Sequence, residues 1–144
     1  MLFIATMLSM VFVACGDEKD EPTTPVSQKI EGEHGEANDT YIVWDINLDQ
    51  DSSSIYVYNA KFSERMPVTV NVRIDAPCVA DKSKKVFTFT GTDITPYLLR
   101  EGTPVPYESM PVTNLTSVVN TEKKTYSISF DCHGGHYDKT GSLK

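Results

Sequence analysis

The sequence has few cysteines, a shortage of positive charge and no long hydrophobic run after its first residues. Three cysteines in 144 residues are too few for a disulfide-rich scaffold. The 13 basic residues are outnumbered by 20 acidic ones, and a net charge of −7 repels phosphate backbones, so we expect no nucleic-acid partner. The length and the 40% hydrophobic content predict one folded domain with its own core.

Motifs for catalysis and for phosphate or calcium binding are also missing. There is no Gly-x-Ser-x-Gly elbow, no cysteine–histidine protease signature and no glycine-rich phosphate loop. The carboxylates Asp45, Asp49 and Asp51 lie close together but lack the glycine and the distal glutamate of a calcium loop. We therefore expect a protein that is not an enzyme and needs no cofactor.

The amino terminus has the features of an export signal. Leu2 to Ala14 is a largely apolar stretch of 13 residues, too short to cross a hydrocarbon core of about 30 Å as a helix. The following Phe12-Val13-Ala14-Cys15-Gly16 resembles the lipobox of bacterial lipoproteins, in which the cysteine receives a diacylglycerol group. The resemblance implies a signal peptide over residues 1–14 and lipid attachment at Cys15.

A charged patch and a Pro/Thr-rich stretch follow the cysteine without hydrophobic periodicity. This composition predicts a flexible tether over residues 15–29, followed by a single domain over residues 30–144. The acidic cluster Asp17-Glu18-Lys19-Asp20-Glu21 also resembles the signal that sends some lipoproteins to the outer membrane. We expect a lipid-anchored protein of the bacterial outer membrane, and the sequence leaves open whether the anchor lies in the inner leaflet or in the outer leaflet with the protein exposed at the cell surface.

The domain itself has the period-two pattern of β-strands. In Val68–Asp75 the apolar residues alternate with polar ones, and Thr125–Asp131 repeats this pattern, so both are expected to be half-buried antiparallel strands. The best helical candidate is one turn over Asp93–Leu99, which contains Pro96. Weaker strand candidates, rich in β-branched or aromatic residues, are Tyr41–Asn47, Ser54–Phe62, Lys85–Gly91, Pro111–Asn120 and Tyr137–Lys144.

Short strands separated by turn residues favour an antiparallel β-sandwich or β-barrel. The segment Ser54–Tyr58 is unusual because both of its faces are apolar, with Ile55 and Val57 opposite Tyr56 and Tyr58. One face is expected in the core, and the other either packs within the protein or meets a lid, a neighbour or a ligand.

The order and spacing of several segments resemble the calycin-like β-barrel lipoproteins, a family largely of unknown function. These segments are Tyr58–Pro67, Gly91–Pro96, Asn114-Leu-Thr, Tyr126–Cys132 and Tyr137–Lys144. The resemblance implies an antiparallel calycin- or lipocalin-like barrel of about eight strands, closed or partly open. Such a barrel is filled by side chains or holds one small ligand. The aromatic residues expected to line a ligand site are Trp44, Tyr56, Tyr58, Phe87 and Phe89.

Two further hypotheses concern the cysteines and the histidines. An exported protein can form a disulfide between Cys78 and Cys132 if their strands lie close enough. The segment Cys132-His133-Gly134-Gly135-His136, with His34, offers metal-ligand types without the second ligand pair of a structural zinc site. A hairpin turn explains the same glycines, and we expect that turn rather than a metal site.

The sequence therefore predicts a membrane-anchored binding module of the cell envelope, whose ligand is either a small apolar molecule in the barrel or a macromolecule on its rim. The alternative is a structural or interaction subunit of a surface protein complex, with a fully packed barrel and no ligand pocket. The expected partners are the membrane, through the lipid, and either a small apolar ligand or a surface protein.

Overall fold

The computed structural model describes residues 27–61, 68–132 and 134–144, which form eleven β-strands and no helix. The segment expected to form a helical turn, Asp93–Leu99, instead leads into a strand, so that prediction was wrong. The strands are β2 (Ser27–Glu31), β3 (Tyr41–Asn47), β4 (Ser53–Ala60), β5 (Val70–Ala76), β6 (Cys78–Ala80), β7 (Val86–Gly91), β8 (Tyr97–Arg100), β9 (Thr103–Pro106), β10 (Thr113–Asn120), β11 (Thr125–Cys132) and β12 (Gly135–Ser142).

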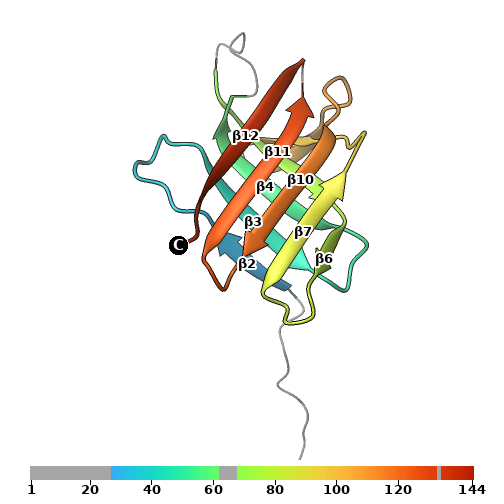
Figure 1. The fold of residues 1–144 in the computed structure, drawn as a ribbon. Helices are drawn as coiled ribbons and strands as arrows, with labels where there is room; N and C mark the ends of the chain where they lie inside the picture. Colours follow the sequence, from blue (N-terminus) through green and yellow to red (C-terminus); the bar gives the residue numbers. More distant parts are fainter. Residues whose placement is uncertain (1–26, 62–67, 133) are drawn as a thin grey trace, which may run out of the picture.

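The strands form two antiparallel sheets that pack face to face. One has five strands in the order β12-β11-β10-β7-β6, and the other has six in the order β2-β3-β4-β5-β8-β9. The strands of the two sheets cross at a steep angle (Figure 1). The predicted all-β, antiparallel class is confirmed.

The two sheets are not closed into a barrel, so of the closed and partly open forms that the sequence allowed, the closed form was wrong. The described residues form eleven strands, where about eight were expected. The sheets are joined where β5 continues through Pro77 into β6, and by two isolated bridges, Gly32–Leu143 and Ile94–Val112. Two of the edges offer little for further pairing, because β6 has only three residues and Pro104 and Pro106 on the edge strand β9 have no N–H to donate.

The core lies between the sheets and follows the period-two pattern. Trp44 on β3, Ile74 on β5 and Phe130 on β11 have no exposed surface, while their chain neighbours face outward. The Trp44 Nε1 donates to Ser117 Oγ at 3.0 Å, and Ser117 Oγ donates to the Ser127 carbonyl at 2.9 Å. The one indole in the chain is thereby tied to the opposite sheet.

The sheet begins earlier than the sequence indicated. Residues 27–29, assigned to the tether, pair with β3 as part of β2.

The proposed signal peptide, Cys15 and most of the proposed tether lie outside the described residues. In the part of the chain that is described, no helix is long and apolar enough to cross a membrane.

Candidate functional site

The five aromatic residues expected around a ligand separate into two groups. Trp44, Phe87 and Phe89 belong to the core, with 0, 3 and 0% of their surfaces exposed, so they fill the interior and do not line a pocket. Their assignment as ligand-binding residues is corrected accordingly. Tyr56 and Tyr58 lie on the outer face of the six-stranded sheet and are half-buried.

This outer face carries an unusual number of aromatic side chains. Cross-strand pairing places them together: Tyr41 lies opposite Tyr58, Val43 opposite Tyr56, Tyr56 opposite Arg73, and Arg73 opposite Tyr97. All are half-buried. We call this surface the tyrosine face, and its members are Tyr41, Val43, Tyr56, Tyr58, Arg73 and Tyr97.

The rings of the tyrosine face stack in a row that His34 extends. The ring centroids of His34 and Tyr41 are 4.2 Å apart, those of Tyr41 and Tyr58 are 4.8 Å apart, and those of Tyr58 and Tyr56 are 6.1 Å apart. The planes of neighbouring rings differ by 16°, 19° and 8°. Since the ring faces cover one another, an approaching molecule meets mainly ring edges and hydroxyls.

The hydroxyls of this row are available to a partner. Among the described residues, no hydrogen bond uses the hydroxyl of Tyr41, Tyr56, Tyr58 or Tyr97. Burial, followed by the neighbouring phenols Tyr41 and Tyr56, raises the pKa of Tyr58. That hydroxyl therefore stays protonated at neutral pH and can both donate and accept a hydrogen bond.

Arg73 is fixed at the other end of the tyrosine face. Its guanidinium carbon lies 4.3 Å from the centre of the Tyr97 ring, a cation–π arrangement. The Nε is 3.1 Å and the Nη2 3.3 Å from the two carboxylate oxygens of Asp75. Ser54 Oγ donates to the same carboxylate at 2.7 Å. Arg73 is thus held in one orientation before any partner arrives.

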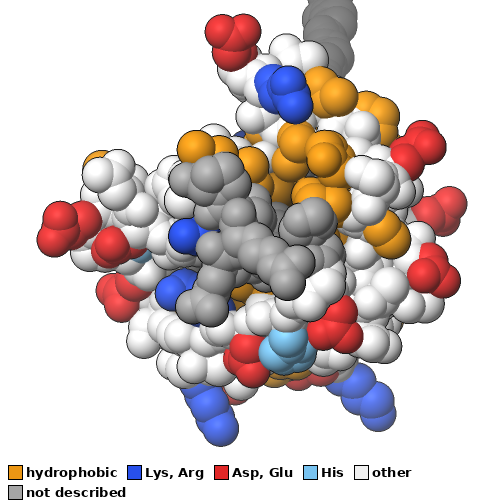
Figure 2. Space-filling view, turned by 90° about the horizontal axis from the view of Figure 1, so that it is seen from above, with side chains coloured by type: hydrophobic (Ala, Val, Ile, Leu, Met, Phe, Trp, Pro, Cys, Tyr) orange, Lys and Arg blue, Asp and Glu red, His pale blue; other side chains and the backbone are white. Residues whose placement is uncertain are grey.

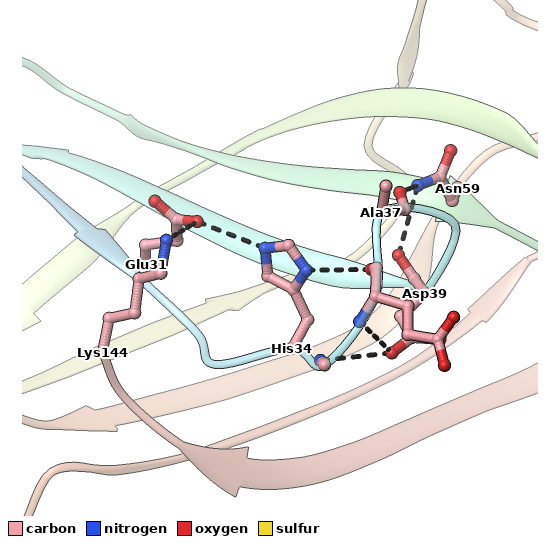
Figure 3. A network of polar contacts seen from close by, with 8 residues as sticks. Glu31, His34, Ala37, Asp39, Asn59 and Lys144 are labelled. Atoms are coloured by element: carbon pink, nitrogen blue, oxygen red, sulfur yellow. Dashed lines mark hydrogen bonds and ion pairs between the residues drawn. The ribbon is translucent and has the colours of Figure 1, made fainter.

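A polar network holds His34 at the start of the row (Figure 3). His34 Nδ1 lies 3.2 Å from the Glu36 carbonyl, and its Nε2 lies 3.5 Å from Glu31, which also pairs with Lys144 at 3.1 Å. Because a carbonyl only accepts, His34 Nδ1 is the donor of the first contact.

The loop after His34 is fastened to β4 by Asn59. The Asn59 side-chain amide donates to the carbonyls of Ala37 and Asp39, both at 3.2 Å. Asn59 has a φ of 56° at the point where the pairing of β4 with β5 is irregular. Asparagine tolerates this left-handed conformation better than most residues, so the irregularity positions the side chain that anchors the loop.

The outer face of the five-stranded sheet is chemically different. Its side chains are mostly hydroxyl-bearing or charged, with Val118 apolar at a central position and Val79 and Val86 apolar toward the β6 edge. The members of this polar face are Thr88, Thr90, Thr116, Val118, Ser127, Ser129, Asp131, His136, Asp138 and Thr140. Such a face is ordinary for a solvated antiparallel sheet.

An open cleft of about 550 Å³ lies at one end of the polar face, where β11 turns into β12. It is lined by residues of the β11–β12 turn and of the segment before β10, among them Pro111, Asp131 and His136. Figure 2 looks onto this end, where histidine and acidic side chains lie together at one margin and hydrophobic side chains gather on the opposite side.

Asp131 and His136 lie at the cleft and form a hydrogen-bonded pair in which each residue shifts the pKa of the other. Asp131 Oδ1 lies 2.7 Å from His136 Nδ1, and Asn114 donates to Asp131 Oδ2 at 2.9 Å. These hydrogen bonds, with that from Asn114 the larger cause, lower the pKa of Asp131. The bond to Asp131 raises the pKa of His136.

Ser129 Oγ lies 3.4 Å from His136 Nε2, which gives the order carboxylate, imidazole, hydroxyl. The side chains of Asp131 and His136 are 42% and 57% exposed, whereas a hydrolytic triad keeps its carboxylate buried. Asp138 also competes for the same nitrogen at 3.8 Å. The arrangement is therefore that of a surface ion pair.

Replacing Asp131 with asparagine is expected to lower the pKa of His136, because it removes the largest cause of the upward shift. Because the pKa of His136 is higher in the folded protein, the ion pair stabilises the fold fully only below the pKa of histidine in the unfolded chain, about 6.5. This stabilisation is lost as the pH rises through the pKa of His136 in the folded protein. An NMR titration of the His136 ring measures the shift. Asp138→Asn is the control and lowers the pKa less; an unchanged pKa in Asp131→Asn contradicts the pairing.

The two described cysteines do not form the disulfide that the sequence left open. Cys78 and Cys132 are both free thiols, and burial raises the pKa of each to about 11. Cys78 lies on β6 and Cys132 on β11, with β7 and β10 between them. Three strand spacings of about 4.8 Å far exceed the roughly 7 Å that a disulfide allows between Cα atoms.

The predicted hairpin turn is confirmed, since Cys132 pairs with Gly135 and Gly134 has a φ of 75°. His133 lies outside the described residues. Cys132 is buried and His136 is on the outer face, so the two side chains point to opposite sides of the sheet. In the described ranges, no group of three or more His, Cys, Asp or Glu side chains is placed to hold a metal ion.

Sequence reasoning identified Tyr56 and Tyr58 but missed Tyr41, Arg73 and Tyr97. The available signal was that β3, like β4, has apolar residues on both faces, with Tyr41 and Val43 opposite Ile42 and Trp44. No family model, curated protein or solved structure matches this chain.

Proposed function

We propose that this protein is a membrane-anchored lipoprotein of the bacterial cell envelope whose domain binds a surface protein partner through the tyrosine face. The single observation that carries the proposal is the contrast between the two outer faces. One sheet presents hydroxyl and charged groups to solvent, and the other presents four tyrosines and a fixed arginine. An apolar and aromatic surface of this kind on a small domain is typical of an interaction site.

The chemistry of the tyrosine face suits a protein partner. Tyrosine and arginine are the residue types that contribute most often to the energetic centre of protein interfaces. The stacked row and the Arg73–Asp75 pair are ordered in advance, so little side-chain entropy is lost on binding. The unbonded hydroxyls supply hydrogen bonds at the edge of an apolar surface.

The interior gives less support to a small apolar ligand. Side chains from both sheets meet in one cluster that includes Trp44, Phe89 and Phe130, each without exposed surface. This favours the interaction subunit with a packed interior over a carrier of a small molecule. The calycin-like relationship remains part of the proposal, as an opened relative of that barrel without its cavity.

Replacing Tyr58 with serine is expected to weaken partner binding by about 30-fold, the effect of losing roughly 2 kcal/mol at the centre of an interface. The measurement uses a photo-crosslinking amino acid at Val43, in cells that make the full chain. A discrete adduct with a protein is expected from Val43, and Tyr58→Ser should reduce its yield. The matched probe at Thr116, on the polar face, should give no adduct. Equal adducts from both faces would contradict the proposal.

The anchor is tested separately through Cys15. Each buried CH₂ of an acyl chain contributes about 0.8 kcal/mol, so several chains hold a protein on a membrane. Cys15→Ala is expected to abolish palmitate labelling and to release the protein from the membrane fraction. Cys78→Ala is the control and should leave labelling unchanged. A Cys15→Ala protein that is still labelled would rule out lipid attachment at this residue.

A further inference from the structure

The two sheets end in four edge strands, and three of them are blocked or short. β6 has only three residues. Directly after β9, the Tyr107 amide donates to the Pro96 carbonyl. By alternation, the residues of β9 whose backbone points away from β8 are Pro104 and Pro106, which have no N–H. β2 has five residues, and the Lys144 amide already takes the outward carbonyl of Glu31, which leaves a short free stretch at Ser27 and Lys29.

The fourth edge, β12, is long and regular. It pairs with β11 over eight consecutive residues without a shift in register. Leu143 N donates to the Lys124 carbonyl on the β11 side, whereas the Ser142 carbonyl accepts from Glu33 N on the other side. By alternation, the backbone groups of His136, Asp138 and Thr140 point away from β11. Within the described residues no backbone hydrogen bond uses these outward groups.

We infer that this free edge pairs with the same edge of a second copy of the chain, so that two β12 strands lie antiparallel and join two five-stranded sheets. Such a contact is self-complementary and closes as a two-fold dimer. The outward N–H and C=O groups of one strand then meet those of the other, as in any antiparallel ladder. The inference goes beyond the proposed function, because it uses neither the tyrosine face nor the lipid.

The side chains of β12 favour one register for this pairing. Centring the pair on Tyr137 places His136 of each copy opposite Asp138 of the other, which gives two pairs of opposite charge, and places the two Tyr137 side chains together on the inner side. Centring on Asp138 would place two aspartates opposite each other, and centring on Lys139 would place two lysines together. Like charges directly opposite are destabilising, so those registers are disfavoured.

The surroundings of His136 agree with this register. Its Nδ1 is held by Asp131 at 2.7 Å, which favours the protonated ring, while its Nε2 is directed to Ser129 at 3.4 Å and Asp138 at 3.8 Å. The side chain is 57% exposed and therefore accessible to the aspartate of a second copy.

The test is sedimentation equilibrium of the full chain carrying Cys15→Ala, over protein concentrations from about 10 µM to 1 mM. A reversible monomer–dimer equilibrium is expected. Asp138→Pro removes an outward N–H without breaking a bond to β11, and it should raise the dissociation constant at least about 10-fold with an unchanged circular dichroism spectrum. Asp138→Ala keeps the N–H and should weaken the dimer less. A wild-type protein that stays monomeric, or an Asp138→Pro dimer as tight as the wild type, overturns the inference.

Amide hydrogen exchange followed by NMR locates the contact. The outward amides of His136 and Asp138 should gain protection as the protein concentration rises, whereas that of Lys29, on the edge of β2, should not. Protection that rises at Lys29 and not at β12 would place the dimer contact elsewhere and overturn the inference.

Discussion

Replacing Trp44 with alanine is expected to lower the free energy of unfolding by about 3–5 kcal/mol, the largest effect of any single substitution considered for this domain. Trp44 has no exposed surface, and its ring lies 4.9 Å from that of Tyr126 on the opposite sheet. Alanine leaves a cavity between the sheets and removes the hydrogen bond to Ser117. Since small domains are stable by only about 5–15 kcal/mol, this loss is a large fraction of the total.

Urea denaturation of the Trp44→Ala variant measures this loss of stability. One further substitution isolates the contribution of the hydrogen bond, and a second is the control. Ser117→Ala leaves the indole N–H buried without an acceptor and should cost about 1–3 kcal/mol. Thr116→Ala, at the neighbouring exposed position of β10, should change the stability by less than about 0.5 kcal/mol. A loss below about 1 kcal/mol in Trp44→Ala would mean that the indole is not packed between the sheets.

The strands that sequence reasoning located best are those with one apolar and one polar face. The expected Val68–Asp75 and Thr125–Asp131 correspond to β5 and β11, with differences of no more than two residues at their ends. In both, a period-two pattern is enough to separate the buried side from the solvated one. Short edge strands such as β6 and β9 have no such pattern, because they are barely buried, and they were missed.

The arrangement of the strands could not be derived in the same way. Whether a set of antiparallel strands closes depends on hydrogen bonds between segments far apart in the chain, and local alternation is the same in a barrel and in a sandwich. One example is β9, where Pro104 and Pro106 occupy the positions whose backbone points away from β8 and therefore offer no N–H to a further strand. The tyrosine face was difficult to predict for the same reason, since Tyr41, Arg73 and Tyr97 come together only through cross-strand pairing.

The other large effect is expected at Gly141, where substitution by valine should destabilise the domain by about 1–3 kcal/mol through overpacking. A Cβ at Gly141 would lie 2.8 Å from the Tyr126 hydroxyl oxygen and 2.9 Å from its Cε2. The ring also lies close to Gly32 on the other sheet, where an added Cβ would be 3.0 Å from the same Cε2, so little space remains beside it. Tyr126 thus covers two glycines where the bridge between Gly32 and Leu143 joins the sheets.

The double variant Tyr126→Leu/Gly141→Val tests whether the ring is the cause. If the clash with Tyr126 is responsible, the two substitutions should be less than additive in urea denaturation, with a coupling of about 0.5–3 kcal/mol. Gly35→Ala is the control, because a Cβ there meets only the Asp39 carboxylate at 3.4 Å. Full additivity would mean that Gly141 is required for a reason other than the close approach of Tyr126. Less than additive losses would instead identify the close approach of Tyr126 as the reason that this position requires a glycine.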